Sequence, residues 1–231
     1  MMNRNTFIKS LTKSFNWLLA LGYELRQVET SIYFEKHSNN EVHSINFFWS
    51  EYDVIKIQGV FALKRFNFIE SIIERITGNL DYTIHKKWEG TIPKEFAAEA
   101  NGVTLTDAFY LSDKNQIKLF SEIIEGFYNS EVQPFFNNFN SIENILYWLN
   151  TNETPDHVKL LVSNNNSMML RKLIIMKESN SSDYHSLYEK YRDFLEQKNR
   201  QRESPYTEMY DEFIKFDEYF NKHQIKSDRK V

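Results

Sequence analysis

The spacing of apolar residues changes along this chain, and these changes restrict the fold more than any other feature. Near the start, four apolar residues recur every three or four positions: Phe7, Leu11, Phe15 and Leu18. This spacing is typical of one face of an amphipathic helix. Gly22 follows, and glycine in a left-handed conformation commonly ends a helix. We therefore predict a helix over residues 5–21.

After this helix the period becomes two, which is typical of strands with one buried face. The alternating segments are 32–35, 45–49 and 54–63. Short polar stretches separate them, at Ser38-Asn39-Asn40 and at residues 50–53. Because consecutive strands with short turns pair with their neighbours, this order predicts an antiparallel meander.

Residues 66–111 contain both the helical spacing and the strand-like alternation of apolar residues. Apolar residues at helical spacing predict a helix over 66–77, which Gly78-Asn79 ends. Alternation predicts strands over 80–84 and 103–111. Between these strands, a proline near the start and a glycine past the end predict a short helix over 93–100.

From Asp113 onward helical spacing dominates. Helices are predicted over 114–130, from Asn140 to about 150, from Thr154 to Leu161, over 169–176, over 184–195, and after Ser204-Pro205. For the short run 169–176 a strand is the alternative. In the stretch EVQPFFNNFNSIENILYWLN, Pro134 predicts a corner between two helices, because proline removes a helical hydrogen bond. Phe135, Phe136 and Phe139 are expected to fill that corner, and Asn140 with Glu143 is expected to cap the next helix.

The class predicted is α+β. An N-terminal helix and a mostly antiparallel sheet of about five strands occupy residues 1–112, and a helical region over 113–231 packs on them. We expect the two parts to form one integrated domain.

Composition excludes several kinds of chemistry. The chain has no cysteine, which rules out thiol catalysis, thiolate zinc sites and disulfides and fits a reducing cytoplasm. It has only 6 glycines, and neither a phosphate-binding glycine motif nor a G-x-S-x-G nucleophile motif occurs. We expect no cofactor.

The net charge and the length of the apolar runs argue against nucleic acid and membranes as partners. A formal net charge of −4 does not attract nucleic-acid backbones, and the basic residues after Asn221 are typical of a solvated terminus. No apolar run reaches the roughly 18 residues of a membrane span, and the run at 17–21 is too short for a signal peptide. These features predict a cytoplasmic protein.

One hairpin is a candidate metal site. It contains two carboxylates and two imidazoles within nine residues: Glu35, His37, Glu41 and His43. Three such ligands suffice for zinc. However, a two-residue turn at Asn39-Asn40 places His37 opposite Val42 and His43 opposite Lys36, so the two histidines face opposite sides of the hairpin. An ordinary polar hairpin is the simpler interpretation.

Two further features are candidates for function. Tyr147 and Trp148 lie off the apolar face of their predicted helix, and exposed rings of these types anchor protein interfaces. The alternative is that another helix covers them. A carboxylate cleft would require acids such as Asp53, Asp81 or Asp107 to converge, which spacing alone does not predict.

Four segments of the chain carry a resemblance to known proteins: FNWLLALGYELRQVETSIYFEK, INFFWSEYDVIKIQGVFAL, EVQPFFNNFNSIENILYWLN and MMLRKLIIMKESNSSDYHSLYEKYRDFL. Through these segments the chain resembles a bacterial domain-of-unknown-function family. Some proteins of this kind occur beside toxin genes and are suspected immunity factors. The resemblance implies no catalytic residue.

The preferred hypothesis is a non-catalytic cytoplasmic bacterial protein that binds another protein, with neutralisation of a toxin as its most specific form. The alternative is a metal-dependent hydrolase or nuclease that uses the His37 and His43 hairpin or a carboxylate cleft. The sequence leaves the oligomeric state open.

Overall fold

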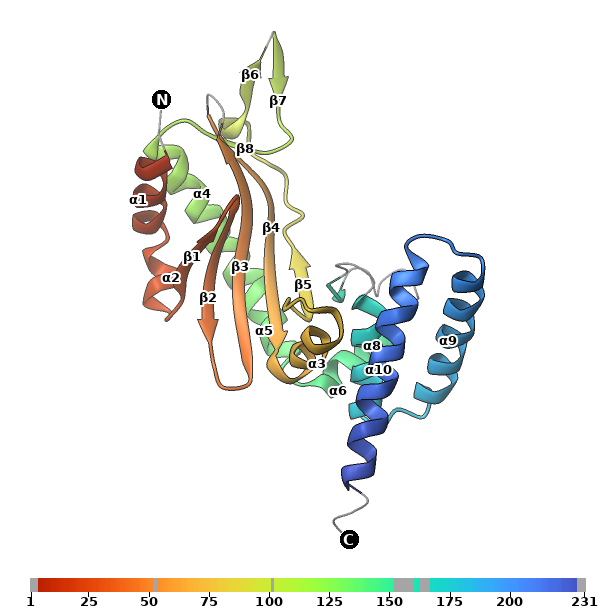
Figure 1. Ribbon diagram of the computed structural model, residues 1–231. Helices are drawn as coiled ribbons and strands as arrows, with labels where there is room; N and C mark the ends of the chain where they lie inside the picture. Colours follow the sequence, from red (N-terminus) through yellow and green to blue (C-terminus); the bar gives the residue numbers. More distant parts are fainter. Residues whose placement is uncertain (1–3, 52–53, 101, 152–159, 163–166, 228–231) are drawn as a thin grey trace. The chain divides into compact units, whose positions relative to one another are not determined.

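The computed structural model describes residues 4–51, 54–100, 102–151, 160–162 and 167–227 (Figure 1). An N-terminal helix precedes an antiparallel sheet and the C-terminal half is helical, so the predicted α+β class is confirmed. The chain divides into two compact units, and each combines two separate stretches of sequence. The first unit comprises Met1–Arg65 and Ile84–Asn140, and the second comprises Phe66–Thr83 and Ser141–Val231.

The first unit is built on the sheet. Its strands are β1 (Glu24–Val28), β2 (Ser31–His37), β3 (Glu41–Glu51), β4 (Ile55–Phe66), β5 (Ile84–Lys87) and β8 (Phe109–Leu111). The order is β1-β2-β3-β4-β5, and both β5 and β8 pair antiparallel with β4 at different points along its length. The predicted meander therefore exists, but it begins with a strand at 24–28 that the alternation did not reveal.

Helices of the first unit cover one face of this sheet (Figure 1). They are α1 (Arg4–Ser14), α2 (Asn16–Ala20), α4 (Lys114–Phe127) and α5 (Gln133–Asn138). Phe15, between α1 and α2, stacks on Phe34 of β2 at 5.1 Å between ring centroids, and Phe120 of α4 meets Phe47 of β3 at 5.5 Å. These buried rings form the core of the unit.

The helix predicted over 5–21 is interrupted once, at Phe15. The chain still turns after it at Gly22, whose φ of 87° lies in the left-handed region. All four residues of the predicted apolar stripe are fully buried. The stripe therefore predicted burial correctly, although it did not show the interruption.

A bulge reverses the facing of residues along β4. Ile55 and Ile57 are buried before it, and Val60 and Ala62 are buried after it, so the buried positions change from odd to even. Gly59 lies at the change and has a φ of 62°, a conformation that favours glycine in strands that bulge. The buried side of β4 is therefore apolar from Ile55 to Ala62, and Lys64, which follows on that side, is paired with Glu41.

The corner predicted at Pro134 has a different form. The chain continues from α4 through a π-helical turn, Tyr128–Val132, directly into α5. Pro134 is the second residue of α5, where a missing N–H is tolerated. Phe135 and Phe136 are buried, as predicted.

Other boundaries differ from the prediction. The strand expected over 80–84 begins only at Ile84. The expected helix over 93–100 is a single 3-10 turn, Lys94–Phe96, followed by β6 (Ala98–Ala100). The strand expected over 103–111 is divided between β7 (Val103–Leu105), which pairs with β6, and β8, which pairs with β4. Two different pairing partners explain this division.

The second unit is helical. Its helices are α3 (Asn67–Thr77), α6 (Ile142–Thr151), α8 (Ser167–Glu178), α9 (Tyr184–Arg200) and α10 (Tyr206–Ser227). Helix α8 contacts α3, α6 and α9, and α9 pairs with α10. Seven of the 12 residues of α8 are buried, which explains why its apolar residues are not confined to one face.

At the start of α6, the Ser141 hydroxyl accepts a hydrogen bond from the Asn144 amide at 3.4 Å, which is the contact of a helix cap. Most of the helix predicted from Thr154 to Leu161 lies outside the described residues. None of the helices within the described residues is both long and apolar enough to cross a membrane.

The change in sequence character near residue 112 does not coincide with the division into units. Helix α4 follows that point but belongs to the first unit, where Phe120 packs against Phe109 and Phe15. Residues 66–83 precede that point but belong to the second unit.

Candidate functional site

The candidate metal hairpin has the register that its two-residue turn predicts. Strands β2 and β3 pair His37 with Val42 and Lys36 with His43, and the Ser38 amide donates to the Glu41 carbonyl at 2.9 Å. Side chains of neighbouring positions in a strand point to opposite faces. His37 and His43 therefore face opposite sides of the sheet, as predicted.

The two carboxylates of the hairpin are divided in the same way. On one face, Glu35 accepts two hydrogen bonds from Arg26, at 2.7 and 2.8 Å, and its Oε2 lies 3.6 Å from His37 Nε2. On the other face, Glu41 Oε1 lies 2.9 Å from His43 Nε2, and Glu41 Oε2 lies 2.7 Å from Lys64 Nζ. The four residues thus form two ion-paired groups. Among the described residues, no three histidines or carboxylates converge as a metal site would require.

His43 is held in a neutral state by its surroundings. Its ring stacks on Phe136 of α5 with 4.2 Å between centroids. Burial lowers the pKa of His43 to about 4; the Lys64 charge acts in the same direction and Glu41 opposes both. This geometry suits a structural residue of the sheet.

The aromatic pair on α6 is divided between surface and interior. Ile145 and Leu149 form the buried face of the helix. Tyr147 is 73% exposed, whereas Trp148 is half-buried. Of the two candidates for contact with a partner, Tyr147 is the one presented to solvent.

The candidate carboxylates belong to different parts of the chain. Asp107 lies in the first unit, where Lys56 and Tyr110 donate to it at 2.8 and 2.6 Å. Asp81 lies in the second unit, and Asp53 is outside the described residues.

A buried ion pair in the second unit was not predicted. Arg171 of α8 and Glu70 of α3 have side chains with 0% exposure. Arg171 Nε donates to Glu70 Oε1 at 2.8 Å, and Arg171 Nη2 donates to Glu70 Oε2 at 2.7 Å. This bidentate geometry is among the strongest that charged side chains form.

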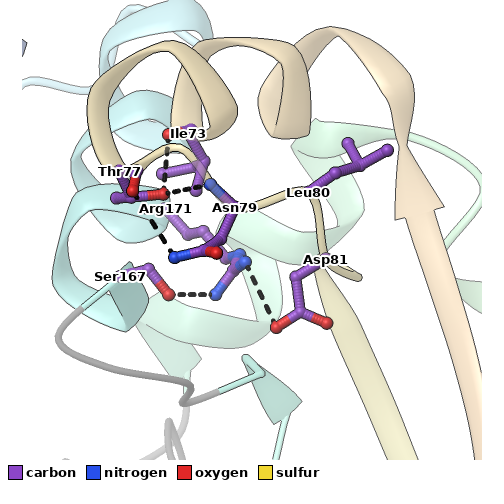
Figure 2. A pocket seen from close by; sticks show the side chains of 7 residues that line it. All are labelled: Ile73, Thr77, Asn79, Leu80, Asp81, Ser167 and Arg171. Atoms are coloured by element: carbon purple, nitrogen blue, oxygen red, sulfur yellow. Dashed lines mark hydrogen bonds and ion pairs between the residues drawn. The ribbon is translucent and has the colours of Figure 1, made fainter. Parts of the chain in front are cut away.

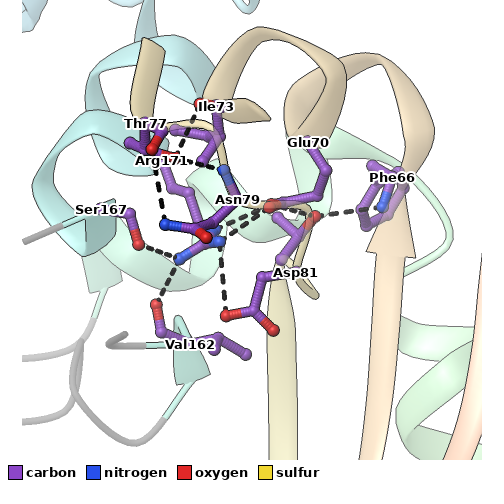
Figure 3. Close-up of polar contacts among 10 residues, drawn as sticks. Phe66, Glu70, Ile73, Thr77, Asn79, Asp81, Val162, Ser167 and Arg171 are labelled. Carbon is purple, nitrogen blue, oxygen red and sulfur yellow. Dashed lines mark hydrogen bonds and ion pairs between the residues drawn. The ribbon is translucent and has the colours of Figure 1, made fainter. Parts of the chain in front are cut away.

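The ion pair is the centre of a larger polar network (Figure 3). Arg171 Nη1 also donates to the Val162 carbonyl at 2.7 Å and to the Ser167 hydroxyl at 2.6 Å. On the other side, the Thr83 hydroxyl donates to Glu70 at 2.9 Å and accepts from the Phe66 amide at 3.1 Å. Both charges are therefore satisfied without solvent.

A pocket of about 330 Å³ opens beside this network (Figure 2). Its lining residues are Ile73, Thr77, Asn79, Leu80, Asp81, Ser167 and Arg171. The pocket is at the C-terminal end of α3, where Gly78 adopts a left-handed conformation and its amide donates to the Glu74 carbonyl at 2.7 Å.

The turn after Gly78 positions the polar side chains of the pocket (Figure 2). The Thr77 hydroxyl donates to the Ile73 carbonyl at 3.0 Å and accepts from the Asn79 amide at 3.2 Å. Asn79 Nδ2 donates to the Thr77 carbonyl at 3.4 Å. Asp81 Oδ2 lies 3.9 Å from Arg171 Nη2, and the Asp81 side chain is 22% exposed. A carboxylate thus faces the opening while the guanidinium is buried behind it.

A second pocket, of about 430 Å³, lies in the first unit at the bulge of β4. Its walls include the rings of Phe48, Phe61, Trp88 and Phe109, together with the backbone of Gly59. A side chain at Gly59 would meet the Phe61 ring at 2.7 Å, so glycine keeps this wall open.

Comparison with known proteins adds no assignment, because no protein-family model, no curated protein and no solved structure matches this chain.

Proposed function

We propose that this chain is a non-catalytic, cytoplasmic bacterial protein that acts by binding another protein, and that the partner is a toxin which it neutralises. Such a protein works by covering the active surface of its target, so it needs shape and charge but no reactive group. Its net charge of −4 suits a basic target, such as a toxin that acts on nucleic acid.

The observation that carries the proposal is the exposed ring of Tyr147. Among the described residues most aromatic rings are buried, but this ring is 73% exposed on α6. Tyrosine is enriched among the residues that dominate binding energy at protein interfaces. The residues on either side of it along the exposed face, Glu143, Asn144 and Asn150, are polar, as the rim of an interface is.

Growth rescue tests the proposal directly. The gene next to this one in its native genome is expressed in a bacterial host, with and without this chain, and growth is followed. We expect the neighbouring gene to arrest growth and this chain to restore it. We expect Tyr147→Ala to weaken the rescue and Tyr147→Phe, which keeps the ring, to retain it.

Direct binding separates this proposal from an enzymatic one. Isothermal titration of the purified neighbour protein into this chain is expected to show a saturable complex that Tyr147→Ala weakens by about 2 kcal/mol or more, the range of an interface hot spot. Metal-dependent turnover of a nucleic acid or an ester by the pure chain, without any complex, would contradict the proposal and favour a hydrolase.

A further inference from the structure

We propose that the pocket at the bulge of β4 binds a small planar aromatic molecule that carries a carboxylate. This pocket has a volume of about 430 Å³, and its described lining residues all belong to the first unit. A ligand there goes beyond the proposed function, because Tyr147 belongs to the second unit. Three structural features support the assignment: a gap in strand pairing, aromatic walls that rest on glycines, and a lysine without an ion pair.

The pocket lies where the pairing of β4 with its neighbours is interrupted. Strand β8 pairs with β4 at Ile55–Ile57, and β5 pairs with it from Phe61 onward. The residues of β4 between these pairings, Gln58–Val60, all line the pocket. Further walls come from the chain after β5, within Trp88–Ile92, and from the chain before β8, at Asp107–Ala108. Separate segments thus surround a concave site, as is typical of ligand pockets.

Two rings of the pocket wall rest directly on glycine backbone. A Cβ added at Gly59 would lie 2.7 Å from the Phe61 ring, and a Cβ added at Gly90 would lie 2.5 Å from the Trp88 ring. At the other four of the 6 glycines, an added Cβ would come no closer than 3.8 Å to the described residues beyond its chain neighbours. Gly59 also has the left-handed backbone of the bulge, but Gly90 does not have a positive φ. Room for the Trp88 ring is therefore the reason for glycine at position 90.

The accessible rings of the pocket favour an aromatic ligand. Phe48 is 44% exposed, and Phe61 and Trp88 are half-buried. Phe48 meets Phe61 at 6.1 Å between centroids and an angle of 73°, and Trp88 meets Phe109 at 5.0 Å and 45°. Aromatic pairs gain energy beyond burial when they stack with an offset or meet edge to face. A planar ring in the pocket can make such contacts, whereas an aliphatic group of the same size cannot.

The charge that the ligand meets is positive. The charged residues in the described lining are Lys87 and Asp107. Asp107 accepts hydrogen bonds from Lys56 at 2.8 Å and from Tyr110 at 2.6 Å, so its charge is already compensated. The Lys87 ammonium makes no hydrogen bond or ion pair among the described residues. Because an ammonium donates strong hydrogen bonds to a carboxylate, we expect Lys87 to bind the acidic group of the ligand.

The size and polarity of the pocket favour a small molecule. Pockets for such ligands have roughly 300–1,000 Å³ and are mostly apolar with a few polar groups. The volume of about 430 Å³ is near the lower end of this range, and Ile57, Val60, Ile92 and Ala108 complete the apolar lining. A molecule of one or two rings therefore suits the site better than a nucleotide or a longer peptide.

Nuclear magnetic resonance titration of the full chain tests the inference. The probe is naphthalene-2-carboxylate, and the matched neutral probe is naphthalene-2-carboxamide, which has nearly the same shape. We expect saturable shifts of the Trp88 indole signal and the Gly90 amide signal with the carboxylate. The carboxamide should bind about three- to tenfold more weakly, since it lacks the charge that strengthens the hydrogen bond to Lys87. Cyclohexanecarboxylate, which keeps the charge but has no aromatic ring, should bind about tenfold more weakly.

Two variants separate the ring contacts from the charge. Gly90→Ala places a Cβ where the Trp88 ring lies, so both naphthalene probes should bind about tenfold more weakly or worse. Lys87→Met keeps the stem of the side chain and should remove the preference for the carboxylate over the carboxamide. Lys118→Met, which removes an exposed ammonium on α4, is the control and should leave both affinities unchanged. Circular dichroism confirms that each variant is folded.

Four results would overturn the inference: no saturable shift with the carboxylate, equal binding of the carboxamide, binding that Gly90→Ala does not alter, or a preference that Lys87→Met does not alter. Tighter binding of the peptide Gly-Gly-Phe than of naphthalene-2-carboxylate would also overturn it, because it would assign the pocket to the C-terminus of a protein. These outcomes leave the growth-rescue test untouched. Conversely, failed rescue with intact, Lys87-dependent probe binding would reject the proposed function alone.

Discussion

At the residue scale, Glu70 and Arg171 are the charged side chains that are fully buried in the described part of the second unit. Removing a charge from water costs several kcal/mol, and a buried pair recovers this only with good geometry and further hydrogen bonds. Both conditions are met here by the bidentate contact and by the bonds to Thr83, Val162 and Ser167. Loss of one partner should therefore cost far more than loss of a surface pair.

Arg171→Met tests this cost. The variant leaves the Glu70 charge buried, and we expect the free energy of unfolding in urea to fall by about 3–5 kcal/mol. Combining it with Glu70→Leu removes the stranded charge and should recover much of the loss. The control is Glu122→Gln, which breaks the exposed pair with Lys118 and should change stability by no more than about 0.5 kcal/mol. Equal effects of Arg171→Met and Glu122→Gln would contradict this account.

His43 makes stability depend on pH in a defined window. Burial, together with Lys64, lowers its pKa from 6.5 in the unfolded chain to about 4 in the folded protein. Between these values the unfolded chain binds more protons, so the contribution of His43 is complete above pH 6.5 and is lost as the pH falls toward 4.

The non-titrating variant His43→Phe tests this window. We expect the free energy of unfolding of the wild type to fall more steeply than that of the variant between pH 6.5 and 4, by the uptake of about one proton. His185→Gln, at a highly exposed position on α9, serves as the control and should follow the wild type. Parallel curves for wild type and His43→Phe would show that His43 is not protected from protonation.

At the element scale, the bulge in β4 allows one strand to serve two pairing partners. Strand β8 pairs with Ile55–Ile57 before the bulge and β5 pairs with Phe61–Lys64 after it. The left-handed φ of Gly59 produces the change of face between the two segments. Without it, either the first or the second segment would turn its apolar residues away from the core.

Gly59→Ala is expected to destabilise the protein by about 1–3 kcal/mol, because a Cβ strains the left-handed backbone and meets the Phe61 ring at 2.7 Å. Gly126→Ala is the matched control. Gly126 lies on the exposed side of α4 with nothing within 4 Å of an added Cβ, so alanine should stabilise the helix by about 0.5–1 kcal/mol. Thermal and urea unfolding of both variants measure the difference. If Gly59→Ala left stability unchanged, the left-handed backbone at Gly59 would not be needed for the packing of β4.

Sequence spacing predicted these elements unevenly, for physical reasons. Alternation identified β2 and the helical stripe identified α3 and α9, because one buried face dictates the pattern. Strands β3 and β4 and helix α8 were also predicted, although their buried residues are not confined to one face. Strand β1 was not predicted because it is an edge strand with no fully buried residue. The π-helical turn was not predicted because proline occurs both in the first turn of a helix, as Pro134 does in α5, and where a helix ends.

For the candidate site, the turn at Asn39-Asn40 was enough to predict that His37 and His43 face apart, since register depends on local geometry. The pair Glu70 and Arg171 was beyond such reasoning, because 101 positions separate the two residues. The available signal was weak: a charged residue stands within the apolar stretch of each helix. Such a residue is rarely buried unless it is paired.

At the scale of the whole molecule, the chain passes between the two units three times, after Arg65, Thr83 and Asn140. The sequence did not show this division, because the apolar stripe of α4 specifies that the helix is buried but not which element it contacts. The segment 66–83 joins the C-terminal helices through contacts of α3 with α8 and through the Glu70–Arg171 pair. Each unit therefore owes its integrity to contacts between residues far apart in sequence.

Hydrogen exchange of Arg171→Met tests whether the two units, which were divided by their contacts, also unfold independently. We expect loss of amide protection in α8 and, about a hundred positions away, in α3, because the variant strands the buried charge of Glu70 in that helix. Protection in β2 and β3 of the first unit should stay at the wild-type level. Gly59→Ala should give the reverse pattern, with protection lost in the sheet and kept in α8. If both variants lowered protection equally in both units, the chain would unfold as one cooperative body, and the division would describe packing only.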